Sequence, residues 1–374
     1  MRLCRARTQQ MFQKLYNLFT FSLLIYIIVL QDFFKWFSNN SSPSININPK
    51  FNGNTNYFTP QFYVITATYK RYTQKADLTR LAHSFLLNNV KIHWIIVEDT
   101  KENKPNNMLE KFRTDFEKVS TFYQPCENCL KIDLLTASTP DNIKLSKDDP
   151  NWLFPRGANQ RNKGLEFLYE KAASNKYTAN KEALLYFADD DNTYGQNLFE
   201  NLQKLKNFPP EKLIGLIPTG ISGGLKWEGP VCDSIQKDPT GQIKSFHTAW
   251  RPERPFPIDM ASFILKFDQI LITRPTFSSK TRRGYLESDF LIKYLNVKEY
   301  INKFVWDRET AEAVKRGEQL FVPSKDINQK IYDQYVVGLN CGDILVWHTQ
   351  TVKPKDRDEL RLISEGRGSV ELEY

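Results

Sequence analysis

Three consecutive carboxylates, Asp189, Asp190 and Asp191, directly follow the apolar run Ala183–Ala188. Such a run predicts a buried strand whose carboxyl end carries the aspartates. In open α/β sheets this edge is where ligands bind. Adjacent carboxylates repel one another, and a partly dry crevice makes their charge costly unless a cation neutralises it. Oxygen ligands suit Mg²⁺ or Mn²⁺ bridging to phosphate oxygens. The pattern is therefore typical of nucleotide-sugar transferases.

Two other interpretations of the aspartates are weaker. A solvated acidic turn is common in proteins, but it rarely follows so apolar a strand. An EF-hand loop would use Asp189, Asp191, Thr193 and Glu200 as ligands, but it needs glycine where this chain has Tyr194. A strand rather than a helix also precedes the loop, so we set the EF-hand aside.

The segment before the aspartates predicts the nucleotide-binding half of a doubly wound sheet. A strand at Phe62–Thr66, a helix at Lys75–Leu87 and a strand at Ile92–Val97 follow one another, and the second strand ends in Glu98-Asp99. An acid at this place can bond a ribose or a base. Because no Gly-rich phosphate loop accompanies these elements, we expect metal and basic side chains to hold the phosphates.

Arg156 and Arg161 lie near the predicted start of a helix in RGANQRNKGLEFLYEKAA. Exposed backbone N–H groups at a helix start favour anions, and guanidinium groups bind diphosphate well. The pattern is consistent with contacts to a diphosphate or a base. An ordinary surface salt bridge is the alternative.

The second half of the chain brings aromatic, basic and acidic residues together. A strand at Leu213–Pro218 precedes Trp227-Glu228, Trp250 and the segment Arg254–Asp259. Aromatic rings pack on the apolar face of a sugar, while Arg and Asp bond its hydroxyls. Each of these residues taken singly is more often structural.

Two further residues are candidates for chemistry. Glu287 lies close to the start of the predicted helix Phe290–Leu295, where a carboxylate is usually a favourable N-terminal charge but can also serve as a base. His348 follows the predicted strand Ile344–Trp347 and would line the crevice, with a structural histidine as the alternative.

Composition limits the possible partners. The 374 residues are 41% hydrophobic and carry a net charge of +8, which is consistent with a sizeable core and an acidic ligand. A modestly basic surface without a ligand is the alternative. The chain has no Lys/Arg block or aromatic-basic array typical of nucleic-acid modules, so we expect no nucleic acid.

The N-terminus predicts a type II membrane anchor. The uncharged segment Leu15–Leu30 would span roughly 24 Å as a helix, and Phe33, Phe34, Trp36 and Phe37 follow as an interfacial belt. Basic residues precede it, which favours a cytosolic tail at 1–14, an anchor at 15–34, a stem at 35–59 and a lumenal domain at 60–374. A cleaved signal peptide is the alternative, but no small-residue cleavage site follows Leu30.

The stem and the cysteines add little. Asn39 and Asn40 each begin an N-x-Ser pattern, which is consistent with a lumenal stem. Cys126 and Cys129 form one C-x-x-C without a second pair for zinc, so a local disulfide is possible in an oxidising lumen. Cys232 and Cys341 stand apart in the sequence.

Together these segments resemble the β-1,3-glucuronosyltransferases of glycosyltransferase family 43, from about Phe62 to the C-terminus. The similarity runs through eight motifs in the family's order: QKADLTRLAH, IHWIIVEDT, PRGANQRNKGL, LYFADDDNTY, GGLKWEGP, RPFPIDMASF, GYLESDFL and ILVWHT. The resemblance implies a GT-A fold with a Rossmann-like nucleotide-binding half and an acceptor-binding half. It also implies Mn²⁺, UDP-glucuronate, a Golgi membrane location and a homodimer.

The resemblance further implies inverting transfer of glucuronate to the 3-hydroxyl of a terminal β-galactose, with the proteoglycan linkage region as the expected acceptor. By motif, Asp191 resembles the metal ligand and Glu287 the base. The donor-binding residues implied are Tyr69, Asp99, Arg156, Arg161, Asp189, Asp190 and His348. The acceptor-binding residues implied are Glu228, Arg254 and Asp259.

Two positions depart from the family's pattern. Gln350 stands where the family usually has Arg after Trp-His-Thr, and Ala67 stands where we expect Pro. Loss of a guanidinium near a diphosphate removes a charge-assisted bond of about 1.5–3 kcal/mol, unless Lys353 compensates. The alternatives are therefore a different donor such as UDP-xylose, or a Golgi glycan-binding partner with little or no catalysis.

Overall fold

The computed structural model describes residues 59–123, 129–143, 155–174, 180–233, 241–352 and 356–367. These residues lie in one unit that spans Tyr57–Tyr374. The predicted anchor, nearly all of the predicted stem, Cys126 and Lys353 lie outside the described residues. No helix among the described residues has the length and apolar character needed to cross a membrane.

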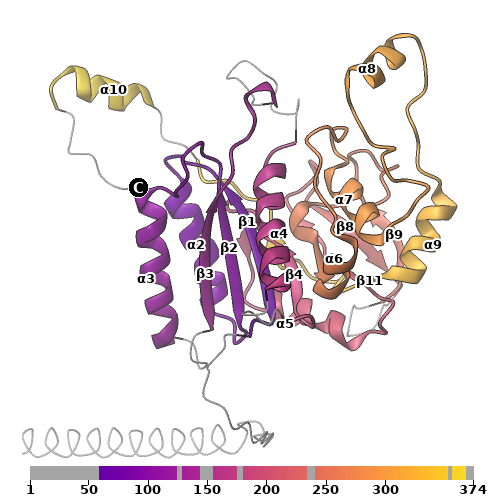
Figure 1. Cartoon of the computed structure of the whole chain (residues 1–374), viewed down its shortest axis with the longest axis horizontal. Coiled ribbons are helices and arrows are strands. Elements are labelled where there is room, and N and C mark those ends of the chain that lie inside the picture. The colour runs from indigo at the N-terminus through magenta and orange to yellow at the C-terminus, as the bar shows by residue number, and fades with distance from the viewer. Residues whose placement is uncertain are drawn as a thin grey trace, which may run out of the picture. The chain divides into compact units, whose positions relative to one another are not determined.

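A mixed seven-stranded sheet forms the centre of the unit, in the order β11-β6-β10-β4-β1-β2-β3 (Figure 1). Strands β3, β2, β1 and β4 are parallel, whereas β10 runs antiparallel to both β4 and β6. The strands are β1 Phe62–Thr68, β2 Ile92–Glu98, β3 Leu130–Thr136, β4 Leu184–Phe187, β6 Ile214–Leu216, β10 Phe263–Lys266 and β11 Val336–Gly338. The chain order reverses between β1 and β4, which makes their carboxyl ends a topological switch point where ligands bind.

Alternate residues of β1 pack on opposite faces of this sheet, as the two-residue period of a strand requires. Tyr63 and Ile65 join a core cluster with α4 (Ala158–Ala173). Phe62 and Val64 join a second cluster with α2 (Gln74–Leu86) and α3 (Asn107–Tyr123). The parallel half is therefore covered on both faces, which confirms the predicted doubly wound half.

Helix α4 lies unusually close to β1. A Cβ atom at Gly164 would stand only 2.8 Å from Ile65 Cγ2, which is closer than real Cβ contacts. Glycine therefore permits this approach of helix to strand. This short distance between α4 and β1 determines where the first turn of α4 lies relative to the carboxyl end of β1.

A second sheet of five short strands has the order β5-β12-β7-β8-β9. Its strands are β5 Thr193–Tyr194, β7 Thr219–Gly220, β8 Trp227–Cys232, β9 Ile243–His247 and β12 Val346–Trp347. Strand β12 pairs with β5, which comes directly after the aspartates. The second sheet thereby brings the residues after β12 beside the end of β4.

The remaining elements are short. The helices are α5 Leu198–Gln203, α6 Phe267–Thr273, α7 Leu286–Leu295, α8 Arg308–Lys315, α9 Lys325–Tyr335 and α10 Asp356–Ser364. Three 3₁₀ turns are η1 Asp141–Ile143, η2 Lys204–Asn207 and η3 Met260–Ser262. Most expected elements are present, with shifted ends: α7 begins at Leu286 rather than Phe290, so Glu287 lies inside its first turn. The last strand begins at Val346 rather than Ile344.

Cys232 and Cys341 form a disulfide that the sequence did not predict. The bond joins the end of β8 to the turn before β12, across a sequence separation of 109 residues. Cys129 is buried directly before β3, but its pairing with Cys126 stays a prediction because Cys126 is outside the described residues.

Candidate active site

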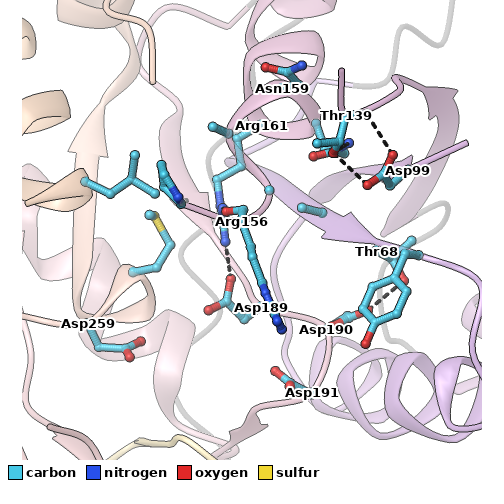
Figure 2. Close-up of a pocket in the computed structure, with 18 of the residues that line it drawn as sticks. Thr68, Asp99, Thr139, Arg156, Asn159, Arg161, Asp189, Asp190, Asp191 and Asp259 are labelled. Atoms are coloured by element: carbon cyan, nitrogen blue, oxygen red, sulfur yellow. Dashed lines mark hydrogen bonds and ion pairs between the residues drawn. The ribbon is translucent and has the colours of Figure 1, made fainter. Parts of the chain in front are cut away.

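A cavity of about 900 Å³ lies at the carboxyl ends of β1 and β4 (Figure 2). It takes residues from the end of β1, the loop after β4, the start of α4, the start of α7 and the segment after β12. Ten of the predicted site residues line it: Tyr69, Asp99, Arg156, Arg161, Asp189, Asp190, Asp191, Asp259, Glu287 and His348. Glu228 and Arg254 do not.

The three aspartates have different partners. Arg161 Nη2 donates to Asp189 Oδ1 at 2.6 Å. Asp190 Oδ2 accepts from Arg71 Nη1 at 2.7 Å. The same oxygen accepts from Thr68 Oγ1 at 2.6 Å (Figure 2). Two of the three carboxylates are therefore neutralised by arginines. The sequence led us to expect a divalent cation as the natural partner of the aspartates, whereas arginine side chains pair with two of them.

Arg161 owes its position to the start of α4. Gly157, the residue before this helix, has φ +73°, a left-handed conformation that favours glycine. A Cβ atom there would meet Arg161 Nη1 at 2.5 Å. The same guanidinium donates to the backbone oxygen of Arg156 at 3.0 Å. The turn Arg156-Gly157 therefore aims Arg161 at Asp189.

Asp191 is the candidate metal ligand. No ion pair involves its carboxylate among the described residues. Burial, with the charges of Asp190 and Asp189, raises its pKa to about 6. A cation at this carboxylate would remove the repulsion. The described residues contain no group of three or more His, Cys, Asp or Glu side chains able to hold an ion.

Glu287 faces the same cavity from the first turn of α7. Burial raises the pKa of Glu287 to about 7, with Asp259 adding to this shift while Arg254 and Arg161 oppose it. A carboxylate that changes protonation near neutral pH is suited to accept a proton from a substrate hydroxyl. Glu287 and Asp191 thus lie in one cavity but come from different halves of the fold.

His348 and Asp259 lie side by side in the cavity wall. His348 Nδ1 is 3.5 Å from Asp259 Oδ2, and contact with this carboxylate raises the pKa of His348 to about 9 despite burial. Asp259 also accepts a bond from the backbone N–H of Ala261 at 3.0 Å, where it begins η3. At neutral pH the imidazole therefore adds a positive charge to the cavity.

Glu228 and Arg254 lie behind the cavity wall rather than on it. Their side chains form an ion pair of 3.0 Å, and each is only 4% exposed. Arg254 Nη1 also donates to the backbone oxygen of Gly284 at 3.0 Å, close to the start of α7. In the structure this pair therefore supports the segment before Glu287, and its contact with a sugar stays a prediction.

The predicted nucleotide contacts lie at the β1 and β2 side. Asp99 accepts bonds from the backbone N–H and the hydroxyl of Thr139 at 2.9 and 2.7 Å. Tyr69 is 45% exposed, and the Arg71 guanidinium lies 4.7 Å from its ring centre. The ring of Tyr69 and the carboxylate of Asp99 therefore both line the cavity. The contacts of these two residues with a nucleotide stay predictions.

Sequence reasoning missed several polar residues around the aspartates. Arg71 lines the cavity, and Arg80 donates to the backbone oxygen of Asp191 at 2.6 Å. Arg282 and Arg283 also line the cavity just before Glu287. Arg80 lies within the motif QKADLTRLAH, but a helix pattern alone could not tell that it reaches a loop more than a hundred residues away.

Three comparisons relate this chain to known proteins. The model of glycosyltransferase family 43 matches residues 81–352. Galactosylgalactosylxylosylprotein 3-beta-glucuronosyltransferase I of Drosophila melanogaster is 36% identical over 314 residues, which cover 83% of this chain and 82% of the relative. The human protein galactosylgalactosylxylosylprotein 3-beta-glucuronosyltransferase 3 is 33% identical over 319 residues, which cover 83% and 76%. A solved structure, S. aureus TarS 1-349 in complex with UDP-GlcNAc, is more distant, with 13% identity, a TM-score of 0.42, and coverage of 79% of this chain and 60% of that chain.

Proposed function

Because the chain belongs to glycosyltransferase family 43, we propose that it transfers glucuronate from UDP-glucuronate to the 3-hydroxyl of a terminal β-galactose. The observation that carries this proposal is the shared cavity of Asp191 and Glu287. In this proposal Asp191 serves the leaving diphosphate and Glu287 serves the attacking hydroxyl. The parallel strands β3 to β4 would form the nucleotide-binding half of a GT-A fold.

Mn²⁺ is part of the proposal, and the residues present fit it. Asp191 supplies one hard oxygen ligand with no cation partner among the described residues, and the diphosphate would supply others. Bound there, the ion would neutralise charge on the departing diphosphate. Arg161 pairs with Asp189 and Arg71 pairs with Asp190, so that Asp191 is the carboxylate left for the metal.

Glu287 is the proposed general base. Its carboxylate takes the proton from the acceptor hydroxyl as that oxygen bonds to the anomeric carbon. The bond from the anomeric carbon to the phosphate oxygen breaks on the opposite face, and its electron pair leaves with UDP. A single displacement turns an α-linked donor into a β-linked product, so no nucleophilic Ser or Cys is needed.

The acceptor proposed is a galactose-terminated glycan, with the proteoglycan linkage region favoured by the names of the relatives. Location in the Golgi membrane through residues 15–34, with a lumenal catalytic domain, also belongs to the proposal. So does a homodimer, which rests on the resemblance to the family.

The test is an assay of the full chain in detergent with UDP-glucuronate, Mn²⁺ and a galactosyl-galactose acceptor. We expect a β1,3-linked glucuronide, identified by mass and by β-glucuronidase release. Absence of product, while a family relative is active in the same assay, would overturn the proposal.

One observation favours a second donor. Gln350 lines the cavity where family members usually carry Arg, so the site holds one guanidinium fewer for an acidic or diphosphate group. A panel of UDP-sugars including UDP-xylose discriminates between the donors. Release of UDP with any of them would also exclude the alternative of a glycan-binding partner without catalysis, against which intact Asp191 and Glu287 already argue.

A further inference from the structure

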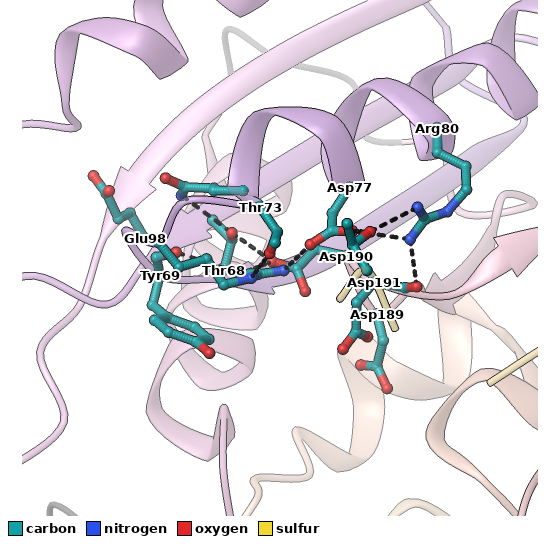
Figure 3. A network of polar contacts seen from close by, with 12 residues as sticks. Thr68, Tyr69, Thr73, Asp77, Arg80, Glu98, Asp189, Asp190 and Asp191 are labelled. Atoms are coloured by element: carbon teal, nitrogen blue, oxygen red, sulfur yellow. Dashed lines mark hydrogen bonds and ion pairs between the residues drawn. The ribbon is translucent and has the colours of Figure 1, made fainter. Parts of the chain in front are cut away.

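Asp77, in the first turn of α2, is a buried carboxylate at the centre of a polar network (Figure 3). Its side chain is only 1% exposed. Asp77 Oδ2 accepts from Arg71 at 2.9 Å, Oδ1 accepts from Arg80 at 3.0 Å, and the hydroxyl of Thr351 also donates to Oδ1. Burial alone would raise the pKa of Asp77, but the bonds from Thr351 and Thr73 and the charge of Arg71 hold it below its ordinary value.

Both arginines bonded to Asp77 continue to the aspartates after β4. Arg71 reaches the side chain of Asp190 at 2.7 Å. Arg80 reaches the backbone instead: it donates to the carbonyl oxygen of Asp191 at 2.6 Å and to that of Asn192 at 3.3 Å. A planar guanidinium with several donors is able to hold two carbonyls, a carboxylate and a hydroxyl together.

The same network holds the segment after β12. Arg80 Nη1 donates to Thr351 Oγ1 at 3.1 Å. Thr349 Oγ1 donates to the backbone oxygen of Asp191 at 3.0 Å. Gln350 lies between these two threonines and lines the cavity. The loop after β4 that carries Asp191 and the segment 349–351 are therefore joined by hydrogen bonds to each other and to α2.

We infer that Asp77 and Arg80 are positioning residues: they fix the backbone of Asp191 relative to the segment 349–351, and so set the site that receives metal and diphosphate. Neither is a catalytic residue. The inference rests on the proposed function, since it assigns these residues to the same donor site. Groups that orient a metal ligand typically change metal affinity or activity by about 10- to 100-fold when they are removed.

The test is UDP binding by calorimetry with the full chain in detergent, in Mn²⁺ and in EDTA. Arg80→Met keeps the aliphatic stem but removes all four bonds. We expect the dissociation constant of UDP in Mn²⁺ to rise about tenfold or more, with little change in EDTA. The ratio of the UDP dissociation constants in EDTA and in Mn²⁺ should therefore be smaller for Arg80→Met than for wild type.

Arg113→Met is the matched control. Arg113 pairs with Glu110 on α3 at 2.7 Å and, like Arg80 with Asp77, lies three residues from its partner, and the side chains of Arg113 and Glu110 are 38% and 46% exposed. Equal losses in both variants, or an Arg80→Met variant within twofold of wild type, would overturn the inference. A specific loss in Arg80→Met at a melting temperature matching that of the control would support it.

A second measurement separates positioning from simple loss of one contact. Thr351→Val removes the hydroxyl that bonds both Asp77 and Arg80. Since residues of one network are not additive, the double variant should lose less affinity than the product of the two single losses. Losses that multiply fully in the double variant would contradict the network.

The proposed reaction and this inference fail in different ways. Wild type that binds UDP with Mn²⁺ but transfers no glucuronate would overturn the proposed reaction only. An affinity of wild type for UDP that is the same in Mn²⁺ and in EDTA would overturn this inference.

Discussion

Arg161 Nη2 lies 2.6 Å from Asp189 Oδ1 and joins α4 to the loop after β4. The next residue, Asp190, pairs with Arg71, which precedes α2. Helices α4 and α2 pack on opposite faces of the sheet. Neighbouring carboxylates are thus held from two sides, and the repulsion between them is already reduced before any ligand binds.

Glu287→Gln should abolish most transfer but leave UDP binding intact. The amide keeps the size of the side chain, but it cannot accept a proton at neutral pH. We expect turnover to fall by about 10²–10⁴-fold, as measured by product formation. The dissociation constant of UDP serves as the control, since Asp191 and the arginines are unchanged. Turnover close to wild type would remove Glu287 from the role of base.

The pH dependence of transfer should follow Glu287 and His348. Burial raises the pKa of Glu287 to about 7, so the rate at low substrate should rise with pH until this carboxyl is ionised. Contact with Asp259 raises the pKa of His348 to about 9, so a second change is expected as the imidazole loses its charge. A pH–rate profile checks both, and a rising limb that persists in Glu287→Asp at the same pH would argue for another base.

Glu287 should also leave a mark on stability. Its pKa is raised from the ordinary value of 4.5 to about 7 in the folded chain. Between pH 4.5 and about pH 7 the folded state therefore binds more protons than the unfolded state. The free energy of unfolding therefore falls as pH rises through this window. Urea unfolding at pH 5 and pH 8 should show a smaller difference for Glu287→Gln than for wild type. An unchanged difference would contradict the raised pKa.

Asp191→Asn should remove the response to metal. An amide oxygen is a neutral and weaker ligand for a hard cation than a carboxylate. We expect EDTA to abolish wild-type transfer, and added Mn²⁺ to restore it in wild type but not in this variant. Glu200→Gln, on the exposed surface of α5, is the control. Restoration of both variants by Mn²⁺ would place the metal elsewhere.

Gln350→Arg introduces the residue that the resemblance to the family leads us to expect at this position. If the donor carries a diphosphate near this position, the added charge-assisted bond should strengthen UDP binding by about 1.5–3 kcal/mol, which is roughly tenfold or more. Gln350→Met tests the loss of polarity without added charge. Weaker UDP binding in Gln350→Arg would indicate that the cavity is adapted to glutamine.

Cys232→Ser and Cys341→Ser should destabilise the chain to the same extent. Loss of a disulfide typically costs about 2–5 kcal/mol, and the double variant should lose no more than either single one. Chemical unfolding in the absence of reductant measures this effect, with Cys4→Ser as the control. Additive losses would contradict the bond.

Local patterns were enough to predict much of the site. The apolar run before Asp189 and the acid at Asp99 both mark strand ends, and these elements depend on neighbouring residues alone. The network of Asp77 and Arg80, and the pairing of Cys232 with Cys341, depend on contacts across the fold. For Glu228 and Arg254, the residue types alone could not distinguish a sugar contact from a buried ion pair.

Gly164 is a position where a substitution that stabilises helices in general should harm this protein. Alanine at a helical position normally favours the helix by roughly 1 kcal/mol over glycine. Here the added methyl group would clash with the side chain of Ile65 in β1. We expect the clash to push the first turn of α4, which carries Arg161, away from the sheet. A substitution that helix propensities favour should therefore displace Arg161 from Asp189, although Gly164 lies one helical turn away from Arg161.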